Sequence, residues 1–454
     1  MSSAQPAAIT APGRTVLGLA WPMALKAIIL HGTVVIDAYL VAGLGETALA
    51  AMGIAAALAG FVLGTVFAFA NAMQLRVAQA WGSGDPVFLK SALGAGLSIS
   101  AVVGAIGLLV LLAFGGSLIA RLAPTPEVAV EAWRYLSIFS LVILGEVVGQ
   151  CLSSYANGCG RTRLPLYSYT LSLPINVAVS VVLIHGYLGL PALGVVGAAI
   201  GSVVAVSVQV AFLAFRLLPE LRGLRTTPGW RGGSFATALR RHLAFVLPIA
   251  ATFVSATIAT QICALIYARL SLNGFAAITL IGPWIMIAGT LGMQWAQATG
   301  IVVAQLLGQR LPETDLDRFL SKAWRAGFYA AGLTSLAYLA VCLSANWLYD
   351  DLAQETRTIL LGFLPILLVL PFPKQSNAIC GNTLRASGDT VYVMALFLWT
   401  QWLFRVPATA LAILWLDLSP FWVLSILLWE EVLKFPAFHS RLRRGDWKRA
   451  DIAA

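Results

Sequence analysis

The chain has 454 residues, of which 59% are hydrophobic and only 11% are charged, and its formal net charge is +10 at pH 7. Soluble globular domains carry about 25% charged residues, so these values exclude a soluble protein with an ordinary surface. They also exclude disordered, collagen-like and coiled-coil chains. A multi-pass membrane protein remains. Because one span needs about 20 apolar residues, the length allows on the order of a dozen spans.

Apolar runs between charged residues and Gly/Pro breaks predict twelve membrane-spanning helices. In chain order they cover residues 15–42, 48–75, 90–120, 130–157, 164–185, 194–217, 243–268, 275–307, 318–348, 356–384, 391–415 and 418–438. Pro371 and Pro373 stand directly before Lys374 and are expected to break the tenth span, because each proline removes a backbone donor. The predicted fold class is an all-α integral membrane protein.

The distribution of basic residues predicts the orientation of these spans. With the N-terminus inside, 22 of the 29 Lys and Arg residues fall on the inner side, four on the outer side and three within spans. This asymmetry places both termini in the cytoplasm by the positive-inside rule. The net positive charge is then a property of a cytoplasmic face beside anionic lipid, and no nucleic acid partner is expected.

The two halves of the chain match at a nearly constant offset. Pro22 matches Pro248 and Gln79 matches Gln305, each pair 226 residues apart, and Gly160 matches Gly388 at 228. Six spans separate equivalent positions, so both halves have the same orientation and form a parallel repeat. We therefore expect two pseudo-symmetric six-helix lobes around a central cavity.

The predicted spans and repeat divide the chain into five parts. They are a cytoplasmic N-terminal tail (1–14), an N-lobe with spans one to six (15–218), a basic cytoplasmic linker (219–240), a C-lobe with spans seven to twelve (241–438) and a basic cytoplasmic tail (439–454).

Short motifs occur in a fixed order in the first half. They are Asp37 followed by a Gly-rich apolar run to Gly45, Gln79 with Gly82, Gly160-Arg161-Thr162 with Pro165, Asn176, and Gly194 with Gly197. In order and spacing they resemble the multidrug and toxic compound extrusion (MATE) family over nearly the whole chain. The resemblance implies a two-lobe, twelve-helix antiporter that exports drugs or metabolites against a Na⁺ or H⁺ gradient.

The chain departs from this family at positions where its branches carry further coupling carboxylates. Those positions hold Ser180, Ala256 and Lys374 here, so of the family's coupling carboxylates only Asp37 remains. Na⁺ coupling through carboxylates of the second lobe is therefore hard to support, and H⁺ is the favoured coupling ion.

Asp37 is the main candidate for coupling. Ionisable residues inside a bilayer are costly, so they usually mark an ion or substrate pathway. Asn71, Gln74, Asn176 and Ser180 are candidates to hydrogen-bond the Asp37 carboxyl group. The alternative is an aspartate that is solvated at the outer interface.

Glu146, Lys374 and Arg405 are predicted cavity or gating charges. Glu146 and Lys374 are 228 residues apart, which makes them equivalent in the repeat. They either form an ion pair between the lobes in one access state or are each satisfied within their own lobe. With Asp37 and Lys26, they make up the two carboxylates and three bases that are predicted to lie within the spans.

Polar side chains within spans are candidates to line a substrate path. They are Gln74, Gln261, Gln294 and Trp402, the last of which can stack with Arg405 or with a substrate. Interhelical hydrogen bonds and an interfacial aromatic belt are the alternatives.

The predicted function is an H⁺-coupled efflux antiporter in the bacterial inner membrane, acting as a monomer on small molecules, with no cofactor besides the coupling ion. Neither the histidines nor the cysteines predict a metal site. A flippase or exporter for a lipid-linked or anionic precursor is the first alternative. A membrane-embedded enzyme is disfavoured because it needs clustered Asp or His at a membrane face.

Overall fold

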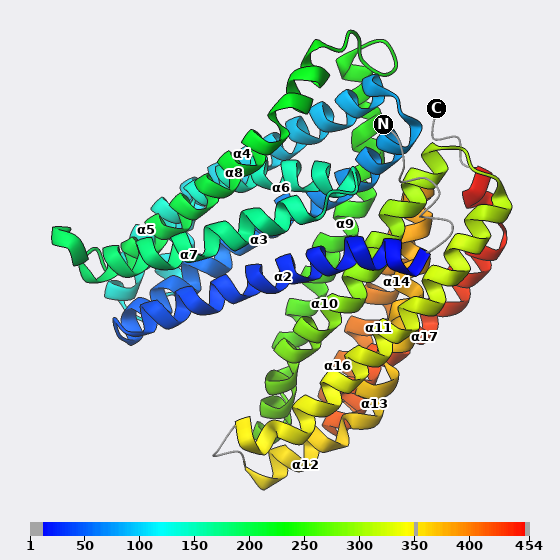
Figure 1. Ribbon diagram of the computed structural model, residues 1–454. Coiled ribbons are helices and arrows are strands. Elements are labelled where there is room, and N and C mark those ends of the chain that lie inside the picture. Colours follow the sequence, from blue (N-terminus) through cyan, green and yellow to red (C-terminus); the bar gives the residue numbers. More distant parts are fainter. Residues whose placement is uncertain (1–11, 349–352, 450–454) are drawn as a thin grey trace. The chain divides into compact units, whose positions relative to one another are not determined.

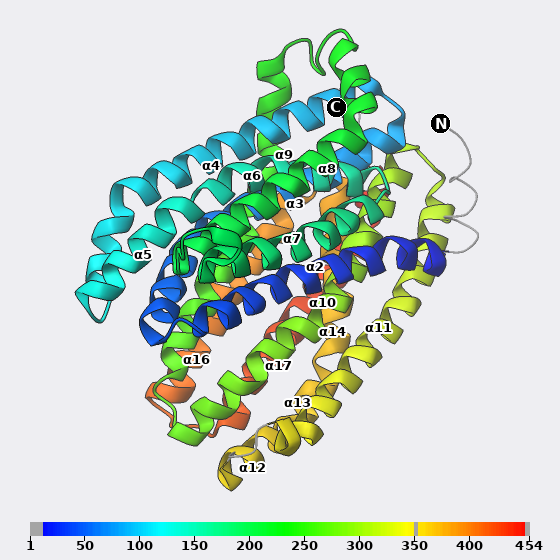
Figure 2. The same cartoon turned by 60° about the vertical axis from the view of Figure 1, so that its left-hand side comes forward.

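The computed structural model describes residues 12–348 and 353–449, and within these ranges the regular structure is entirely helical (Figures 1 and 2). In chain order the α-helices are α2 (Pro12–Ala42), α3 (Glu46–Ser83), α4 (Pro86–Leu122), α5 (Pro126–Phe139), α6 (Leu141–Gly158), α7 (Arg163–His185), α8 (Val195–Thr226), α9 (Phe235–Tyr267), α10 (Leu272–Gly308), α11 (Glu313–Leu348), α12 (Gln354–Gly362), α13 (Leu364–Val369), α14 (Pro371–Ser387), α15 (Thr390–Trp399), α16 (Val406–Leu414) and α17 (Pro420–Arg443). Three short segments accompany them: the 3₁₀ turns η1 (Tyr187–Gly189) and η3 (Asp446–Arg449), and a π-helix, η2 (Thr400–Arg405).

The helices form two compact units. Unit 2 comprises residues 25–250, and unit 1 comprises the described residues up to Ala24 and from Ala251 onward. Each boundary lies two residues after a proline inside a helix, Pro22 in α2 and Pro248 in α9. The boundaries are thus separated by the same 226-residue offset that relates the sequence motifs, which supports the predicted repeat.

A pair of glycines shows the same repeat in the backbone. Gly160 follows α6 with φ of 80°, and Gly388 follows α14 with φ of 98°. Both are left-handed conformations that an L side chain rarely adopts, so glycine is required at both places. The ends of α6 and α14 are therefore equivalent in backbone conformation as well as in sequence.

Most of the predicted spans are present. Ten helices, counting α5 with α6 and α15 with α16, are long and apolar enough to cross a membrane, and a bent pair brings the number to eleven in the described residues. The twelfth predicted span, 418–438, coincides with α17. Every 18-residue window of α17 contains Glu430, Glu431 and Lys434, so this helix is less apolar than the others.

The expected break of the tenth span is confirmed. Helix α14 begins at Pro371 and is bent by 41° from the preceding α12–α13 segment. Pro365 and Pro371 each stand at the first turn of a helix, where the missing backbone N–H is tolerated. The break brings the residues after Pro371, including Lys374, to the N-terminal end of a new helix.

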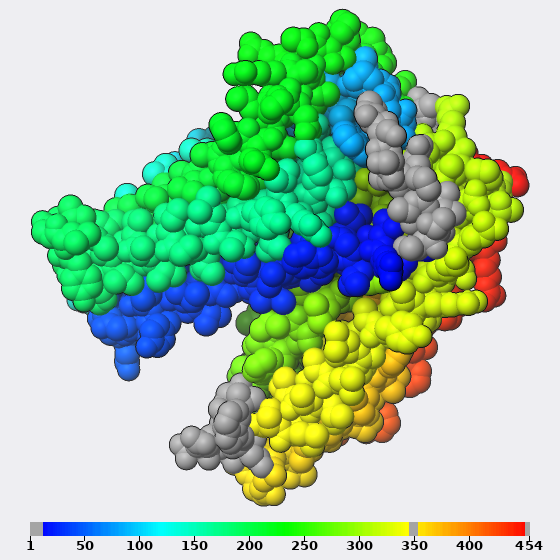
Figure 3. All heavy atoms as spheres, in the orientation of Figure 1, coloured from blue at the N-terminus to red at the C-terminus, as the bar shows by residue number. Residues whose placement is uncertain are grey.

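Unit 2 has an apolar surface as well as an apolar core. On α4, Val102, Ile106 and Leu109 are more than half exposed, which is expected of side chains that face lipid. Inside the unit, α7 packs closely along α8, and α6 packs against α3 and α8. The part of α2 that belongs to unit 2, from Leu25 onward, lies beside α7, and the two form adjacent bands in the space-filling view (Figure 3).

Candidate functional site

Asp37 lies on α2 inside unit 2 and is only 8% exposed, so it is not a solvated aspartate. Ser202 of α8 donates a hydrogen bond from Oγ to Asp37 Oδ2 over 3.4 Å. In the amide orientation that satisfies both of its ends, Asn176 of α7 donates to Asp37 Oδ1 over 2.9 Å and accepts from the Ser202 backbone N–H over 3.3 Å. Three helices thus meet at one carboxyl group whose hydrogen-bond partners are neutral.

The other predicted partners of Asp37 lie elsewhere. Asn71 is exposed on α3, and Gln74 instead accepts a hydrogen bond of 2.8 Å from Asn157 Nδ2 of α6. Ser180 is fully buried, but its hydroxyl has no hydrogen-bond partner in the described residues. Of the predicted set, the structure therefore brings only Asn176 to Asp37, and it adds Ser202, which sequence reasoning missed.

A second buried carboxyl group, Glu146 of α6, belongs to a chain of polar side chains within unit 2. Gln150 Nε2 donates to Glu146 Oε2 over 2.8 Å and to the Tyr169 hydroxyl over 2.6 Å. Lys26 Nζ of α2 donates to Gln150 Oε1 over 3.3 Å and stands 4.9 Å from the Tyr169 ring centroid. Gln150 therefore connects a cation and a carboxyl group that do not touch directly.

This chain of contacts bears on the predicted charge pair. Glu146 has polar partners within its own unit, as one of the two alternatives from the sequence requires. The pairing of Glu146 with Lys374 between the lobes stays a prediction.

Replacing Gln150 by leucine is expected to lower the free energy of unfolding by about 1–3 kcal/mol, because it leaves the buried Glu146 and the half-buried Lys26 without their common partner. Unfolding in mixed detergent micelles, followed by tryptophan fluorescence, measures the change. Gln261→Leu is the matched control, since Gln261 is exposed, and a shift within about 0.5 kcal/mol is expected for it. Equal stability of the two variants would contradict the bridging role of Gln150.

Unit 1 contains a charged cluster that corrects the expectation for its spans. Glu430, Glu431 and Lys434 are additional ionisable residues in the predicted twelfth span, so the expected set of intramembrane charges was incomplete. Lys434 is 2% exposed, and its Nζ lies 3.0 Å from Glu430 Oε1 and 2.8 Å from Glu431 Oε1. Asn377 of α14 donates to Glu431 Oε2 over 2.8 Å. The cluster thus holds α14 against α17.

Arg405 joins this cluster instead of stacking on a tryptophan. It ends the π-helix η2, and its Nε lies 3.8 Å from Glu430 Oε2. Trp402 donates from Nε1 to Ser255 Oγ of α9 over 2.9 Å, so its polar edge is engaged in an interhelical hydrogen bond. The π-helix widens the turn just before Pro407, where the proline ring would otherwise clash with a carbonyl group one turn earlier.

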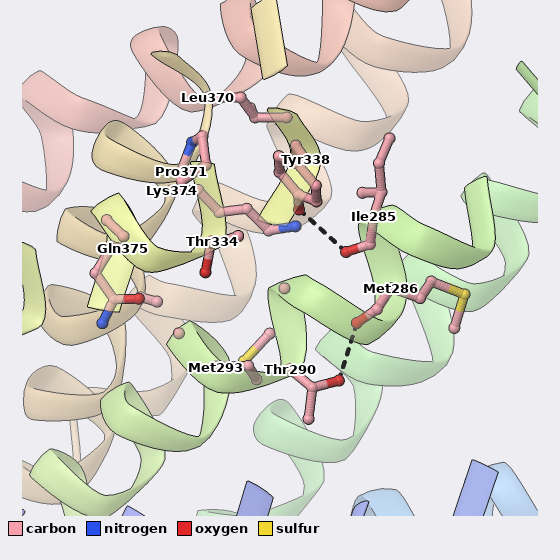
Figure 4. Close-up of a pocket in the computed structure, with 14 residues that line it drawn as sticks. Ile285, Met286, Thr290, Met293, Thr334, Tyr338, Leu370, Pro371, Lys374 and Gln375 are labelled. Atoms are coloured by element: carbon pink, nitrogen blue, oxygen red, sulfur yellow. Dashed lines mark hydrogen bonds between the residues drawn. The ribbon is translucent and has the colours of Figure 1, made fainter. Parts of the chain in front are cut away.

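The other predicted site residues of unit 1 do not lie at one site. Gln261 is exposed on α9, and Gln294 is partly exposed on α10. Lys374 lines a pocket between α10, α11 and α14 that neither glutamine lines (Figure 4). The structure therefore separates Lys374 from the predicted substrate-path glutamines.

The Gly-Arg-Thr motif has a structural explanation. Arg161 makes a two-point ion pair with Glu220 of α8, to which the Tyr155 hydroxyl also donates over 3.3 Å. Such a planar, bidentate pair fixes geometry as well as charge. The motif therefore ties the end of α6 to the end of α8.

Two repeated helical units with buried carboxyl groups in their apolar helices define a multi-pass membrane transporter. The MatE family model matches the chain twice, over residues 22–182 and 248–411, which together exceed half of its length. The chain therefore belongs to the MatE family, and it is a membrane transporter, not an enzyme. The two matches begin at the two repeated prolines.

Relatives of similar length support this assignment. The probable multidrug resistance protein NorM of Rhizobium meliloti is 28% identical over 384 residues, which is 81% of this chain and 79% of the relative. The multidrug resistance protein NorM of Aliivibrio fischeri is 23% identical over 399 residues, 86% of this chain and 84% of the relative.

Solved structures share the whole fold. A MOP superfamily transporter from Pyrococcus furiosus, described as having a binding pocket of reverse polarity, superposes with a TM-score of 0.83 at 18% identity and covers 98% of this chain and 99% of that one. A variant of the Vibrio cholerae MATE transporter VcmN has a TM-score of 0.82 at 18% identity, with 97% and 99% covered. These likenesses confirm the predicted two-lobe, twelve-helix fold.

Proposed function

We propose that the chain is an H⁺-coupled antiporter that exports drugs or small organic metabolites across the bacterial inner membrane by alternating access. Asp37 is the proton-coupling residue, and both termini lie in the cytoplasm. Family membership and the multidrug resistance assigned to NorM relatives support efflux. The charge asymmetry of the loops supports the orientation.

The observation that carries the coupling role is the environment of Asp37. In the described part of the chain, the carboxyl group has an amide and a hydroxyl as its hydrogen-bond partners, and no basic side chain lies within 4.0 Å. Amide and hydroxyl groups both donate and accept, so they can stabilise either protonation state. Glu430 and Glu431, by contrast, are paired with a lysine and are less suited to exchange protons.

Proton binding at Asp37 can act on the helices that meet there. The charged carboxylate accepts from Asn176 of α7 and Ser202 of α8, whereas the protonated group has one hydroxyl to donate. Protonation thus turns one oxygen of Asp37 from an acceptor into a donor, and this alters how α2 is held against α7 and α8. Pro22, which removes a backbone hydrogen bond within α2, lies on the same helix and allows it to bend.

Asp37→Asn is expected to abolish uptake driven by a pH gradient, because the amide cannot carry a proton. The experiment uses the purified protein in liposomes with an imposed pH gradient and the fluorescent cation ethidium, with and without Na⁺. Glu46→Gln is the matched control, since Glu46 is an exposed carboxylate of the same unit. It is expected to transport like the parent protein.

Three outcomes would contradict this proposal in different ways. Uptake that requires Na⁺ would show that the coupling ion is Na⁺ and not H⁺. Unchanged uptake in Asp37→Asn would move the coupling role to another carboxyl group, with Glu146 the next candidate. Absence of cation transport under any gradient would favour the alternative of an exporter or flippase for anionic precursors.

A further inference from the structure

Unit 1 contains a pocket of about 220 Å³ that the coupling site does not include. It lies between α10, α11 and the break between α13 and α14 (Figure 4). Its apolar wall includes Ile285, Met286, Met293 and Leu370. Such a shape, mostly apolar with a few polar groups, is typical of a small-molecule site.

The hydroxyl groups in this pocket already donate to backbone carbonyls. Tyr338 donates to Ile285 O over 3.2 Å, Thr290 to Met286 O over 2.9 Å, and Thr334 to Ala330 O over 3.0 Å. Their hydrogen atoms are therefore not available to a ligand unless those bonds break.

Two donors in the same pocket lack an acceptor. The ammonium group of Lys374 makes no hydrogen bond, and no ion pair within 4.0 Å, in the described residues. The amide nitrogen of Gln375 is buried, also without a partner in these residues. Rotation of the terminal amide exchanges its nitrogen and oxygen, so Gln375 can turn either group to the pocket. Because buried polar groups are normally paired, the unpaired amide nitrogen of Gln375 indicates a missing acceptor, and the half-buried ammonium group of Lys374 lies in the same pocket.

The charges around the pocket give the same answer. The charges of two carboxylates in the cluster on α17, Glu430 and Glu431, act on Lys374. Lys434 contacts both of them at 3.0 Å and 2.8 Å, and Arg405 approaches Glu430 at 3.8 Å. The group therefore has three cations for two carboxylates, and the excess positive charge is at Lys374. A charge in an apolar pocket needs a counter-charge.

We propose that this pocket binds the carboxylate of an amphipathic organic anion. Lys374 pairs with the carboxylate, Gln375 supplies a second hydrogen bond, and the methionine-lined wall covers the apolar body. That the bound anion is an exported substrate rests on the proposed efflux function, whereas the binding site itself does not.

The test measures binding of [¹⁴C]benzoate to the purified full-length protein in lipid nanodiscs. Saturable binding is expected, with competition by benzoate but not by equal concentrations of benzamide or benzylamine, which have the same ring with a neutral or cationic group. Lys374→Met is expected to weaken binding by about 10- to 100-fold, the range for a hydrogen bond to a charged group. Lys374→Arg keeps the charge and is expected to stay within about tenfold of the parent protein.

The controls separate this site from nonspecific effects. Lys322→Met removes an exposed lysine from α11 of the same unit, outside the pocket, and is expected to bind benzoate like the parent protein. Lys374→Met is expected to raise the thermal unfolding midpoint, because it replaces an unpaired charge by an apolar chain of similar length. A loss of binding in this variant is then not a loss of folding.

Equal binding in the parent protein and Lys374→Met would overturn the proposal, as would equal binding of all three ring compounds. Displacement of benzoate by chloride at equal concentration would also overturn it, because the site would then take a simple halide. If the parent protein transports ethidium under a pH gradient but binds no benzoate, this inference fails and the proposed function stands. If the protein binds benzoate but transports ethidium under no gradient, the binding site stands and the proposed function fails.

Discussion

Replacing Lys434 by methionine is expected to lower the free energy of unfolding by about 3–5 kcal/mol, the range for removing one partner of a buried ion pair. Lys434 is 2% exposed and contacts Glu430 and Glu431. Without it, Arg405 would be the only ion-pair partner of the two carboxylates within 4.0 Å in the described residues, and its closest approach to Glu430 is 3.8 Å. The cost arises from the carboxylates left behind, not from the lost methylene packing, which methionine largely restores.

A double variant tests this cause. Lys434→Met with Glu431→Gln removes one charge of each sign and leaves the Arg405–Glu430 pair, and Asn377 can still donate to the new amide oxygen. We therefore expect the double variant to be more stable than Lys434→Met alone, a nonadditivity that reports the pair. The 14 tryptophans provide the fluorescence signal for unfolding in mixed micelles.

Lys322→Met serves again as the control, because it removes an exposed lysine of the same unit. Its effect is expected to stay within about 0.5 kcal/mol. If Lys434→Met were as mild as this control, the buried cluster would not contribute to stability, and the charge argument for Lys374 would lose its basis.

The cluster also shows where sequence reasoning was incomplete. The span 418–438 was predicted by its apolar composition, yet it contains Glu430 and Lys434 four residues apart. That spacing places the two on one face of a helix, where opposite charges pair. The signal was therefore present in the sequence. The sequence did not show that α14 supplies Asn377 to this cluster, because contacts between distant segments depend on how the helices pack.

The coupling site shows the same division. The motif and its family resemblance identified Asp37 and Asn176, and both lie at one hydrogen-bonded site. Ser202 could not be selected among the many serines of the chain, because its position depends on the distance between α7 and α8. Asn71, only one turn of α3 away from Gln74, is exposed, because the face of a helix that turns inward is set by its neighbours.

Glycines set the distance between α7 and α8. Gly197 and Gly201 are one turn apart on α8, in the small-xxx-small spacing that allows helices in membranes to approach closely. A Cβ at Gly197 would lie 2.7 Å from Ile184 N and 2.7 Å from Leu183 C. Both are backbone atoms, and Leu183 O accepts a hydrogen bond from Leu193 N over 2.8 Å, so the end of α7 cannot easily move aside.

Gly197→Ala is therefore expected to destabilise the protein by about 3 kcal/mol, at the upper end of the usual cost of overpacking. Separation of α7 from α8 would also move Ser202 away from Asp37, so we expect transport under a pH gradient to fall in the protein that remains folded. Unfolding in mixed micelles and ethidium uptake in liposomes measure the two effects.

Gly53→Ala is the matched control for this substitution. Gly53 lies within α3, and a Cβ there would meet nothing within 4 Å, so the alanine adds no clash. Alanine is favoured over glycine in a helix by about 0.5–1 kcal/mol, so a slight gain in stability is expected. If Gly197→Ala behaved like Gly53→Ala, close contact between α7 and α8 would not be required. The position of Ser202 beside Asp37 would then need another cause, and the link between helix packing and the coupling site would be lost.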